Sequence, residues 1–323
     1  MSAIGALRRR VLTPNMSETH LDVRGFHVKS DGARIQLERV GAAFITGYAY
    51  AAEARTAAEA EAKLETIETE FRGFAYEGAG MGFAVRDGLP IGGSHHFADF
   101  VAGRGKDHAY MAYIGLGWAM GRLPHFRWSR ITVADPFMRW LVLDGYGFHQ
   151  AYFHTEKYVH DHYLEPDFSW PSEGKRWYAN HAIDQGIGRA LWFVGCTDVE
   201  VVASLIGKYP AARHPDLWAG AGLAATYAGG VTETELRRFA DLAGEYRPQV
   251  SQGSAFAATA RTEAGLITEH TRMATGIFCD LTPAEATLAS AAARPDNDDD
   301  SDVPAYELWR QRLANQFAGL GQR

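Results

Sequence analysis

The stretch Tyr76-Glu77-Gly78-Ala79-Gly80 begins an apolar run that continues to Ala84, and the Gly-x-Gly triplet inside it recurs in four other apolar stretches of the chain. Successive triplets are 37, 30, 41 and 34 residues apart; they are Gly78/Gly80, Gly115/Gly117, Gly145/Gly147, Gly186/Gly188 and Gly220/Gly222. Intervals of this length are typical of repeated helical hairpins. We therefore predict an all-α protein in which about five Gly-x-Gly-marked hairpins stack into one αα-superhelix or toroid-like body.

Helix-start signals outside the triplets favour the same fold class. Asp135-Pro136 places a capping carboxylate before a first-turn proline, and Thr232-x-x-Glu235 and Thr282-x-x-Glu285 have the spacing of capping boxes. No alternating pattern covers eight residues, although 91–101 and 128–134 are candidates for short extended segments. The predicted helices are 33–54, 56–71, 74–86, 107–122, 136–153, 178–194, 198–208, 212–228, 232–245, 250–275, 283–293 and 304–318, with a further helix from Ser2 to Leu12.

The C-terminal region differs in composition from the rest of the chain. An acid-rich segment at 294–304 is expected to repel itself and remain solvated. It is followed by apolar residues at helical spacing, among them Trp309 and Phe317. We therefore divide the chain into a helical-repeat body at 1–293, an acidic linker at 294–304 and an amphipathic helix at 305–323.

Composition excludes several classes of partner. The 323 residues carry a net charge of −7 and no long Lys/Arg cluster, so the positive surface that nucleic acid requires is missing. The most apolar window, 109–123, is shorter than the roughly 20 residues of a membrane-spanning helix. Two cysteines are too few for a disulfide framework, and no apolar segment of an export signal follows Arg8–Arg10. The sequence thus predicts a cytoplasmic protein with no spanning segment and no nucleic-acid partner.

The glycine triplets have two interpretations. They permit helix backbones to approach closely, or they leave a smooth apolar groove able to hold an extended hydrophobic ligand. The first interpretation concerns packing alone. The second makes the glycines and the large aromatic residues near them candidates for substrate binding: Tyr76, Gly80, Gly117, Trp118, Tyr146, Gly147, Gly188, Trp192, Trp218 and Gly222.

Charged residues inside the same apolar helices are the candidates for chemistry, because a buried charge is costly without a partner or a task. Glu77, Asp144 and Asp184 lie close before a glycine triplet, so stacking can bring them to one wall, where neighbouring acids raise each other's pKa. Ion pairing with arginines of adjacent helices is the alternative. The arginines embedded in such helices are Arg122 and Arg189.

Histidines are concentrated between positions 149 and 181. His149, His154, His160 and His162 are separated by five, six and two residues, whereas a helical zinc pair needs a spacing of four. We therefore predict no metal site, with a His-rich metal site between His149 and His181 as the open alternative, and no cofactor, since no nucleotide-binding motif is present. The candidate catalytic residues are Glu77, Asp144, Asp184, Arg189 and His149.

Six segments together resemble a known family: Leu7-Arg-Arg-Arg-Val-Leu-Thr-Pro14, Arg72-Gly-Phe-Ala-Tyr-Glu-Gly78, Ala119-Met-Gly-Arg-Leu-Pro124, Asp144-Gly-Tyr-Gly-Phe148, Gly188-Arg-Ala-Leu-Trp-Phe193 and Asp216-Leu-Trp-Ala-Gly220. They span most of the chain and resemble the UnbL-type domain-of-unknown-function proteins of bacterial enediyne biosynthetic clusters. The resemblance implies an accessory role in converting a linear polyene into the enediyne core of an antibiotic. It supplies no catalytic residues.

The resemblance and the apolar repeats lead to one expected function and one alternative. We expect the protein to bind a hydrophobic polyene-derived polyketide intermediate and to assist its rearrangement, elimination or cyclisation, as a cyclase or isomerase or a subunit of one. The alternative is a non-catalytic helical scaffold or carrier for companion enediyne biosynthesis proteins. An enclosed groove lined by buried acids favours the enzyme, and an open face with exposed aromatic residues favours the scaffold.

Overall fold

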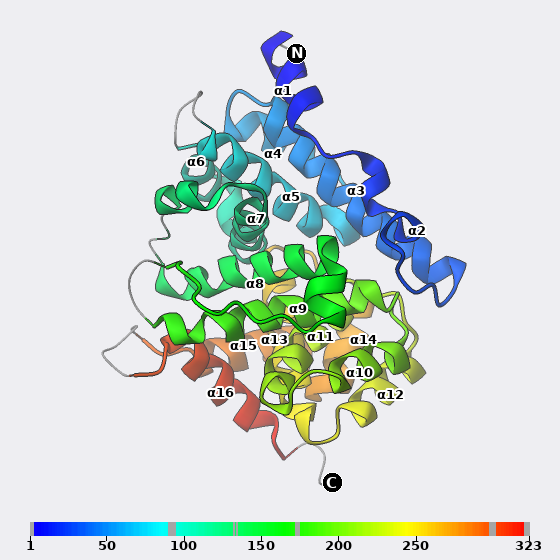
Figure 1. Cartoon of the computed structure of the whole chain (residues 1–323). Helices are drawn as coiled ribbons and strands as arrows, with labels where there is room; N and C mark the ends of the chain where they lie inside the picture. Colours follow the sequence, from blue (N-terminus) through cyan, green and yellow to red (C-terminus); the bar gives the residue numbers. More distant parts are fainter. Residues whose placement is uncertain are drawn as a thin grey trace.

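The computed structural model describes residues 3–89, 95–131, 133, 135–171, 175–296 and 302–319. Within these ranges every regular element is helical and none is a strand, which confirms the predicted fold class (Figure 1). No helix within these ranges combines the length and the hydropathy needed to cross a membrane.

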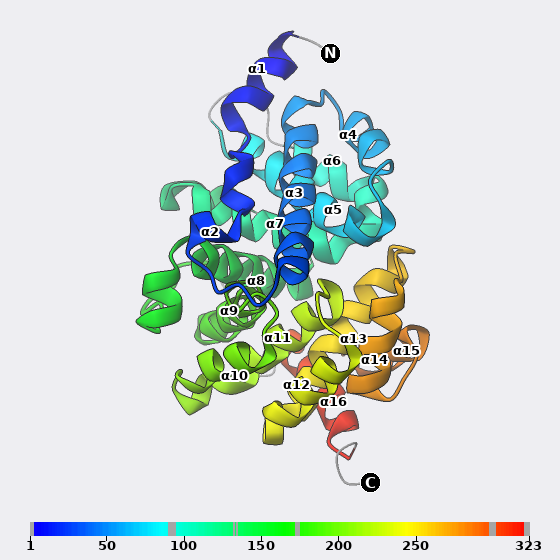
Figure 2. The same ribbon diagram turned by 90° about the vertical axis from the view of Figure 1, so that its right-hand side faces the viewer.

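The longest helices form the centre of the protein and pack on one another in chain order. They are α3 (Asp31–Glu53), α5 (Thr69–Gly88), α7 (Ala109–Arg122), α8 (Pro136–Phe153), α9 (Ala179–Val194), α11 (His214–Tyr227) and α13 (Arg247–Glu263). Figures 1 and 2 show α3, α5 and α7 at one end, followed by α8 and α9 and then by α11, with α13 beside α11. We call these the core helices.

At each crossing of two successive core helices, a glycine from one helix lies next to a glycine from the other. A Cβ at any of these positions would lie 1.9–2.6 Å from a backbone carbonyl oxygen of the neighbouring helix, so only glycine permits the observed approach. In each triplet the first glycine faces the preceding core helix and the second faces the next one. The pairs are Gly47 with Gly78, Gly80 with Gly115, Gly117 with Gly145, Gly147 with Gly186, Gly188 with Gly220, and Gly222 with Gly253.

Shorter helices surround the core helices: α1 (Ala3–Leu12), α2 (Leu21–Arg24), α4 (Ala57–Leu64), α6 (His96–Ala102), α10 (Val199–Gly207), α12 (Glu233–Ala243), α14 (Glu269–Cys279), α15 (Pro283–Ala293) and α16 (Ala305–Phe317). From α9 onward each core helix is followed in the chain by one shorter helix, α10, α12 or α14, and α12 contacts both α10 and α14. Between α7 and α8 the described connection contains only the 3-10 turn His125–Arg130. A short helix therefore follows each of these core helices in the second half of the chain, unlike the connection between α7 and α8.

Several predicted boundaries were wrong. The predicted helices 56–71 and 74–86 are instead α4 and α5, separated by a turn at 65–68. The predicted helix 250–275 is two helices, because Gly265 has a left-handed φ of 67° and Thr268 caps the second one. The predicted extended segment 91–101 contains α6, which begins where the Asp87 carboxylate accepts the backbone N–H groups of His96 and Phe97.

The C-terminal helix α16 packs against α13, α15 and α8. Trp309 donates its indole N–H to the Ser290 carbonyl, and the buried Arg310 guanidinium pairs with Asp216 at 2.7 Å. Part of the predicted acidic linker, 297–301, lies outside the described residues. The helix that follows the linker is thus part of the packed body through both apolar and ionic contacts.

Candidate functional site

One apolar cavity lies between six core helices and the N-terminal segment at 14–19. It contains about 860 Å³ of space not filled by atoms, including its opening, of which about 70 Å³ is wide enough for the centre of a water molecule. The cavity is therefore narrow. Its lining residues are Pro14, Glu18, Thr19, Leu37, Val40, Gly41, Phe44, Ile45, Phe74, Glu77, Met81, Met111, Trp118, Arg122, Phe148, Tyr152, Phe153, Arg189, Phe193, Leu223, Ala224, Tyr227 and Ala228.

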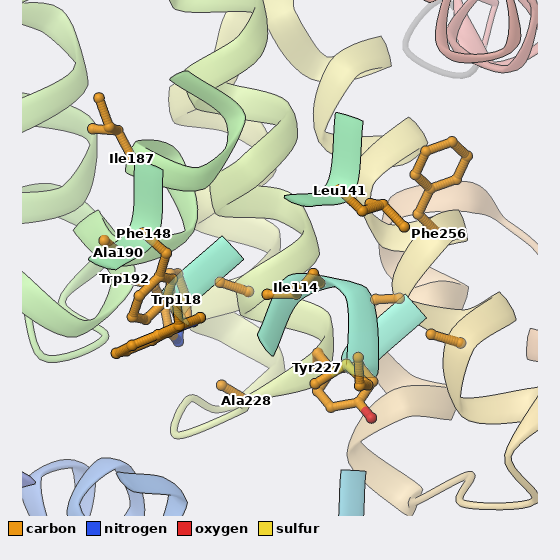
Figure 3. Packing of buried hydrophobic residues seen from close by; sticks show 14 of the residues in the cluster. Ile114, Trp118, Leu141, Phe148, Ile187, Ala190, Trp192, Tyr227, Ala228 and Phe256 are labelled. Atoms are coloured by element: carbon orange, nitrogen blue, oxygen red, sulfur yellow. The ribbon is translucent and has the colours of Figure 1, made fainter. Parts of the chain in front are cut away.

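Aromatic rings form a continuous wall of this cavity. The ring centroid of Trp118 lies 4.5 Å from that of Phe44 and 5.0 Å from that of Phe148, and Phe148 stacks on Tyr152 at 6.0 Å. Figure 3 shows the Trp118 and Phe148 side chains next to each other within the buried apolar cluster. The negative faces of such rings favour a flat conjugated ligand and a positively charged centre.

Three charged side chains from three core helices meet at the inner wall of the cavity. The Arg189 guanidinium on α9 forms a close ion pair with Asp144 on α8, and its Nη2 lies 3.7 Å from Oε1 of Glu77 on α5. Glu77 Oε1 also accepts a hydrogen bond from the indole Nε1 of Trp118 at 2.9 Å. Glu77 and Arg189 line the cavity, whereas Asp144 lies behind them, fully buried.

The arrangement gives Glu77 unusual acidity. The pKa of Glu77 is raised to about 7: burial is the main cause and the neighbouring Asp144 carboxylate adds to it, while Arg189 and the Trp118 N–H oppose the shift. Two carboxylates share one guanidinium here, so Arg189 neutralises only one of them. Because Arg189 contacts Asp144 more closely, Glu77 is the group that holds a proton near neutral pH.

Two residues that were not predicted hold Asp144 in place. The Gln185 side-chain amide on α9 donates to Asp144 Oδ2 at 2.7 Å and to the Tyr306 hydroxyl on α16 at 3.0 Å. Gln185 is a buried amide directly before a glycine triplet, and that position was a signal available in the sequence. Nothing in the sequence indicates that Tyr306 contacts Gln185, because that contact depends on how α16 packs against the core helices.

The third predicted acid does not join this cluster. Asp184 forms a two-pronged ion pair with Arg213, with distances of 2.9 Å and 2.5 Å. Burial raises the pKa of Asp184, and the Arg213 guanidinium opposes the shift. Asp184 does not line the cavity, so its role in the structure is the ion pairing that was the alternative interpretation.

His149 also lies apart from the cavity lining. Its ring packs against Gly121, where a Cβ would lie 2.3 Å from Nδ1, and against Phe153, with ring centroids 4.8 Å apart. Burial lowers the pKa of His149 to about 3, so the imidazole is neutral. Nδ1 is buried with no hydrogen-bond partner in the described structure.

Of the predicted substrate-binding residues, the structure places Trp118 on the cavity wall. Tyr76 donates to Glu65 and stacks on His108, and Tyr146 donates to Glu165. The remaining aromatic candidates pack on Phe239, namely Trp192 and Trp218. The glycine candidates lie at core-helix crossings, where each one contacts a neighbouring backbone: Gly80, Gly117, Gly147, Gly188 and Gly222.

The histidine-rich segment does not form a metal site within the described ranges. No three His, Cys, Asp or Glu side chains of the described residues are grouped to hold a metal ion. His181 Nδ1 instead lies 2.8 Å from Asp216 Oδ2, and this partner raises the pKa of His181.

Comparison with known proteins gives a family but no activity. The model of a family described as "Protein of unknown function (DUF1702)" matches residues 3–317. No curated protein and no solved structure matches the chain. Membership in a domain-of-unknown-function family is therefore confirmed, while the link to enediyne clusters stays a prediction. With nearly its whole length covered by the family model, the chain belongs to the DUF1702 family.

Proposed function

We propose that this protein binds an elongated apolar molecule in the cavity and moves a proton on it through Glu77. The sequence resemblance implies that the ligand is a polyene-derived polyketide intermediate of enediyne biosynthesis and that the reaction is a rearrangement, elimination or cyclisation, in the cytoplasmic setting predicted from composition. The observation that carries the proposal is the unequal sharing of Arg189 by Glu77 and Asp144 at the wall of an apolar cavity.

The protonation state of Glu77 suits acid–base chemistry. A carboxyl group with a pKa near 7 is present in both forms at neutral pH, so it can donate a proton and accept one within a single catalytic cycle. Its side chain is 2% exposed, which keeps bulk water from competing for that proton. Asp144 and Gln185 are positioning residues, because they hold Arg189 at the edge of the cavity.

For a rearrangement or cyclisation, the chemical step balances without a further reactant. Glu77 adds its proton to one carbon of the conjugated chain and, as the carboxylate, removes a proton from another carbon. The double bonds shift and the composition of the ligand stays the same. The positive charge that develops between these events faces the rings of Trp118, Phe44 and Phe148.

The size of the cavity limits how the ligand enters. The 70 Å³ available to water centres is well below the roughly 300–1,000 Å³ of pockets that enclose drug-sized ligands. A long polyene therefore requires lining side chains to move apart. Partly buried residues at the edge, such as Phe44, Phe153 and Leu223, are the ones with room to move.

The proposal extends to the architecture, in which the core helices are successive units of one curved αα-stack around the cavity. The reciprocal glycine crossings support it, because one packing device joins each core helix to the next. The cavity supports it as well, since α3, α5, α7, α8, α9 and α11 all contribute lining residues.

A carrier role for companion enzymes is the second candidate, and the outer face of α1 favours it. Ile4, Leu7 and Val11 recur on one face of this helix and are 69%, 61% and 70% exposed. Arg8 holds the other side of α1 to α3 through the carbonyls of residues 52–54. The exposed apolar face is consistent with contact to another protein.

Native mass spectrometry and absorbance spectroscopy of the full-length chain test the first candidate. We expect linear conjugated polyenes to bind at one per chain, and we expect their absorbance bands to move with time as the double bonds shift. Glu77→Gln is expected to bind the polyene and to leave its spectrum unchanged. Binding without any spectral change in the wild-type protein would support the carrier instead, and no binding would refute the cavity proposal.

A further inference from the structure

We propose that Arg122 binds an anionic head group of the ligand at the opening of the cavity, so that the ligand is a long apolar chain ending in a carboxylate or phosphate. The inference rests on the proposed function and adds the polarity of the ligand to it. Arg122 was noted in the sequence only as a charge in an apolar helix, with no assigned role.

The position of Arg122 defines the opening. It is the last residue of α7, one turn beyond Trp118, and both side chains line the cavity. Every other lining residue is buried or half-buried, and Arg122 alone is exposed. A chain lying along the aromatic wall therefore has the Glu77 cluster beside its apolar part and the Arg122 guanidinium at its solvent end.

The charge of Arg122 is available for a ligand. In the described part of the chain Arg122 makes no hydrogen bond or ion pair. The other guanidinium of the cavity, Arg189, is occupied by Asp144 and Glu77. Besides Glu77, the lining contains the carboxylate of Glu18, which pairs with Arg24 at 2.8 Å.

Two buried groups that feel the charge of Arg122 are themselves neutral. Its positive charge acts on Tyr48 and His149, both buried. Burial raises the pKa of Tyr48 to about 12 and lowers that of His149 to about 3, so both are neutral at pH 7. A guanidinium next to apolar walls and neutral groups attracts an anion more strongly than one paired with a carboxylate.

The chemistry that Arg122 recognises is shared by two sources. A free polyenoic acid presents a carboxylate, and an acyl chain carried on phosphopantetheine presents a phosphate farther from the apolar part. Both accept two parallel hydrogen bonds from a guanidinium. A hydrocarbon or an alcohol of the same length lacks this interaction and serves as the reference ligand.

Fluorescence titration of the full chain with parinaric acid, a conjugated tetraene acid, tests the proposal against the corresponding tetraene alcohol. We expect the wild-type protein to bind the acid about tenfold more tightly at low salt, and Arg122→Gln to remove that preference while binding the alcohol equally well. Arg122→Lys should keep part of the preference. Arg237→Gln, a change at an exposed arginine on α12 away from the cavity, is the matched control.

The outcomes separate this inference from the proposed function. Equal binding of acid and alcohol, or an acid preference that survives Arg122→Gln, overturns the role of Arg122 and leaves the cavity intact. Binding of neither ligand by the wild-type protein overturns both proposals. Titration with the phosphopantetheine thioester of the same acid then identifies the source of the anionic group. If the thioester binds more tightly than the free acid, and Arg122→Gln removes this difference, the group that Arg122 recognises is the phosphate.

Discussion

The indole Nε1 of Trp118 on α7 donates a hydrogen bond to Oε1 of Glu77 on α5, with a separation of 2.9 Å inside the apolar core. The two residues lie 41 positions apart in the chain, and the crossing of Gly80 with Gly115 brings their helices together. The same glycine device that sets the packing therefore also sets the distance between the candidate acid and the aromatic wall.

The raised pKa of Glu77 predicts a specific dependence of stability on pH. A carboxyl group whose folded-state pKa exceeds its unfolded value stabilises the fold below the unfolded pKa, here 4.5, and this contribution is lost as pH rises through about 7. The free energy of unfolding of Glu77→Gln should therefore rise relative to that of the wild type between pH 4.5 and 7, by about 3 kcal/mol, and the difference should level off above pH 7. Urea unfolding at several pH values measures the difference.

Exposed Glu233, which pairs with Arg237 on the surface of α12, supplies the control for this measurement. Glu233→Gln should show little change in its stability difference across the same pH range. A constant difference between wild type and Glu77→Gln from pH 4.5 to 8 would show that Glu77 titrates as an ordinary carboxyl.

Removing Asp144 is expected to destabilise the protein. The change Asp144→Ala leaves the buried Arg189 guanidinium with only the more distant Glu77 carboxylate, and breaking a buried ion pair typically costs about 3–5 kcal/mol. Glu77 should also become more acidic, because it then becomes the sole carboxylate beside Arg189. Thermal unfolding of Asp144→Ala and of the double variant Asp144→Ala/Glu77→Gln measures both effects. The double variant should be the less stable of the two near pH 8, because it leaves Arg189 with neither carboxylate. Near-wild-type stability of the single variant would contradict the buried ion pair.

Substitutions at Gly73 and Tyr227 are expected to have coupled effects on stability, because the two residues are in contact. The Tyr227 hydroxyl is buried with no hydrogen-bond partner in the described structure, and a Cβ at Gly73 would lie 1.9 Å from it. Tyr227→Phe should therefore cost little or stabilise the fold, since it removes an unsatisfied polar group. Gly73→Ala should be destabilising by about 1–3 kcal/mol, and less so in the Tyr227→Phe background. A double-mutant cycle by urea unfolding measures the coupling, and strictly additive effects would contradict the contact.

The sequence predicted the helices and the repeated glycine positions better than it predicted the side-chain contacts between helices that are distant in the chain. Helical class and the glycine triplets were readable because both are local patterns. Gly47 and Gly253, which complete the first and last crossings, have no triplet to mark them. The sequence did not reveal that Asp184 lies apart from Glu77 and Asp144. Asp184 instead pairs with Arg213, which lies in the turn directly before α11.

Two glycine-to-alanine changes should have opposite effects. At Gly117 a Cβ would lie 1.9 Å from the Val142 carbonyl oxygen and 2.9 Å from the Gly145 Cα, so Gly117→Ala must push α7 and α8 apart and should cost about 3 kcal/mol or more. At Gly276, inside α14, no atom lies within 4 Å of the added Cβ, so alanine should gain about 0.5–1 kcal/mol through its higher helix propensity. Chemical unfolding of both variants compares the two directly. A similar small change in both would mean that the crossing of α7 with α8 can loosen without loss, and that glycine is not what fixes the separation of these two helices.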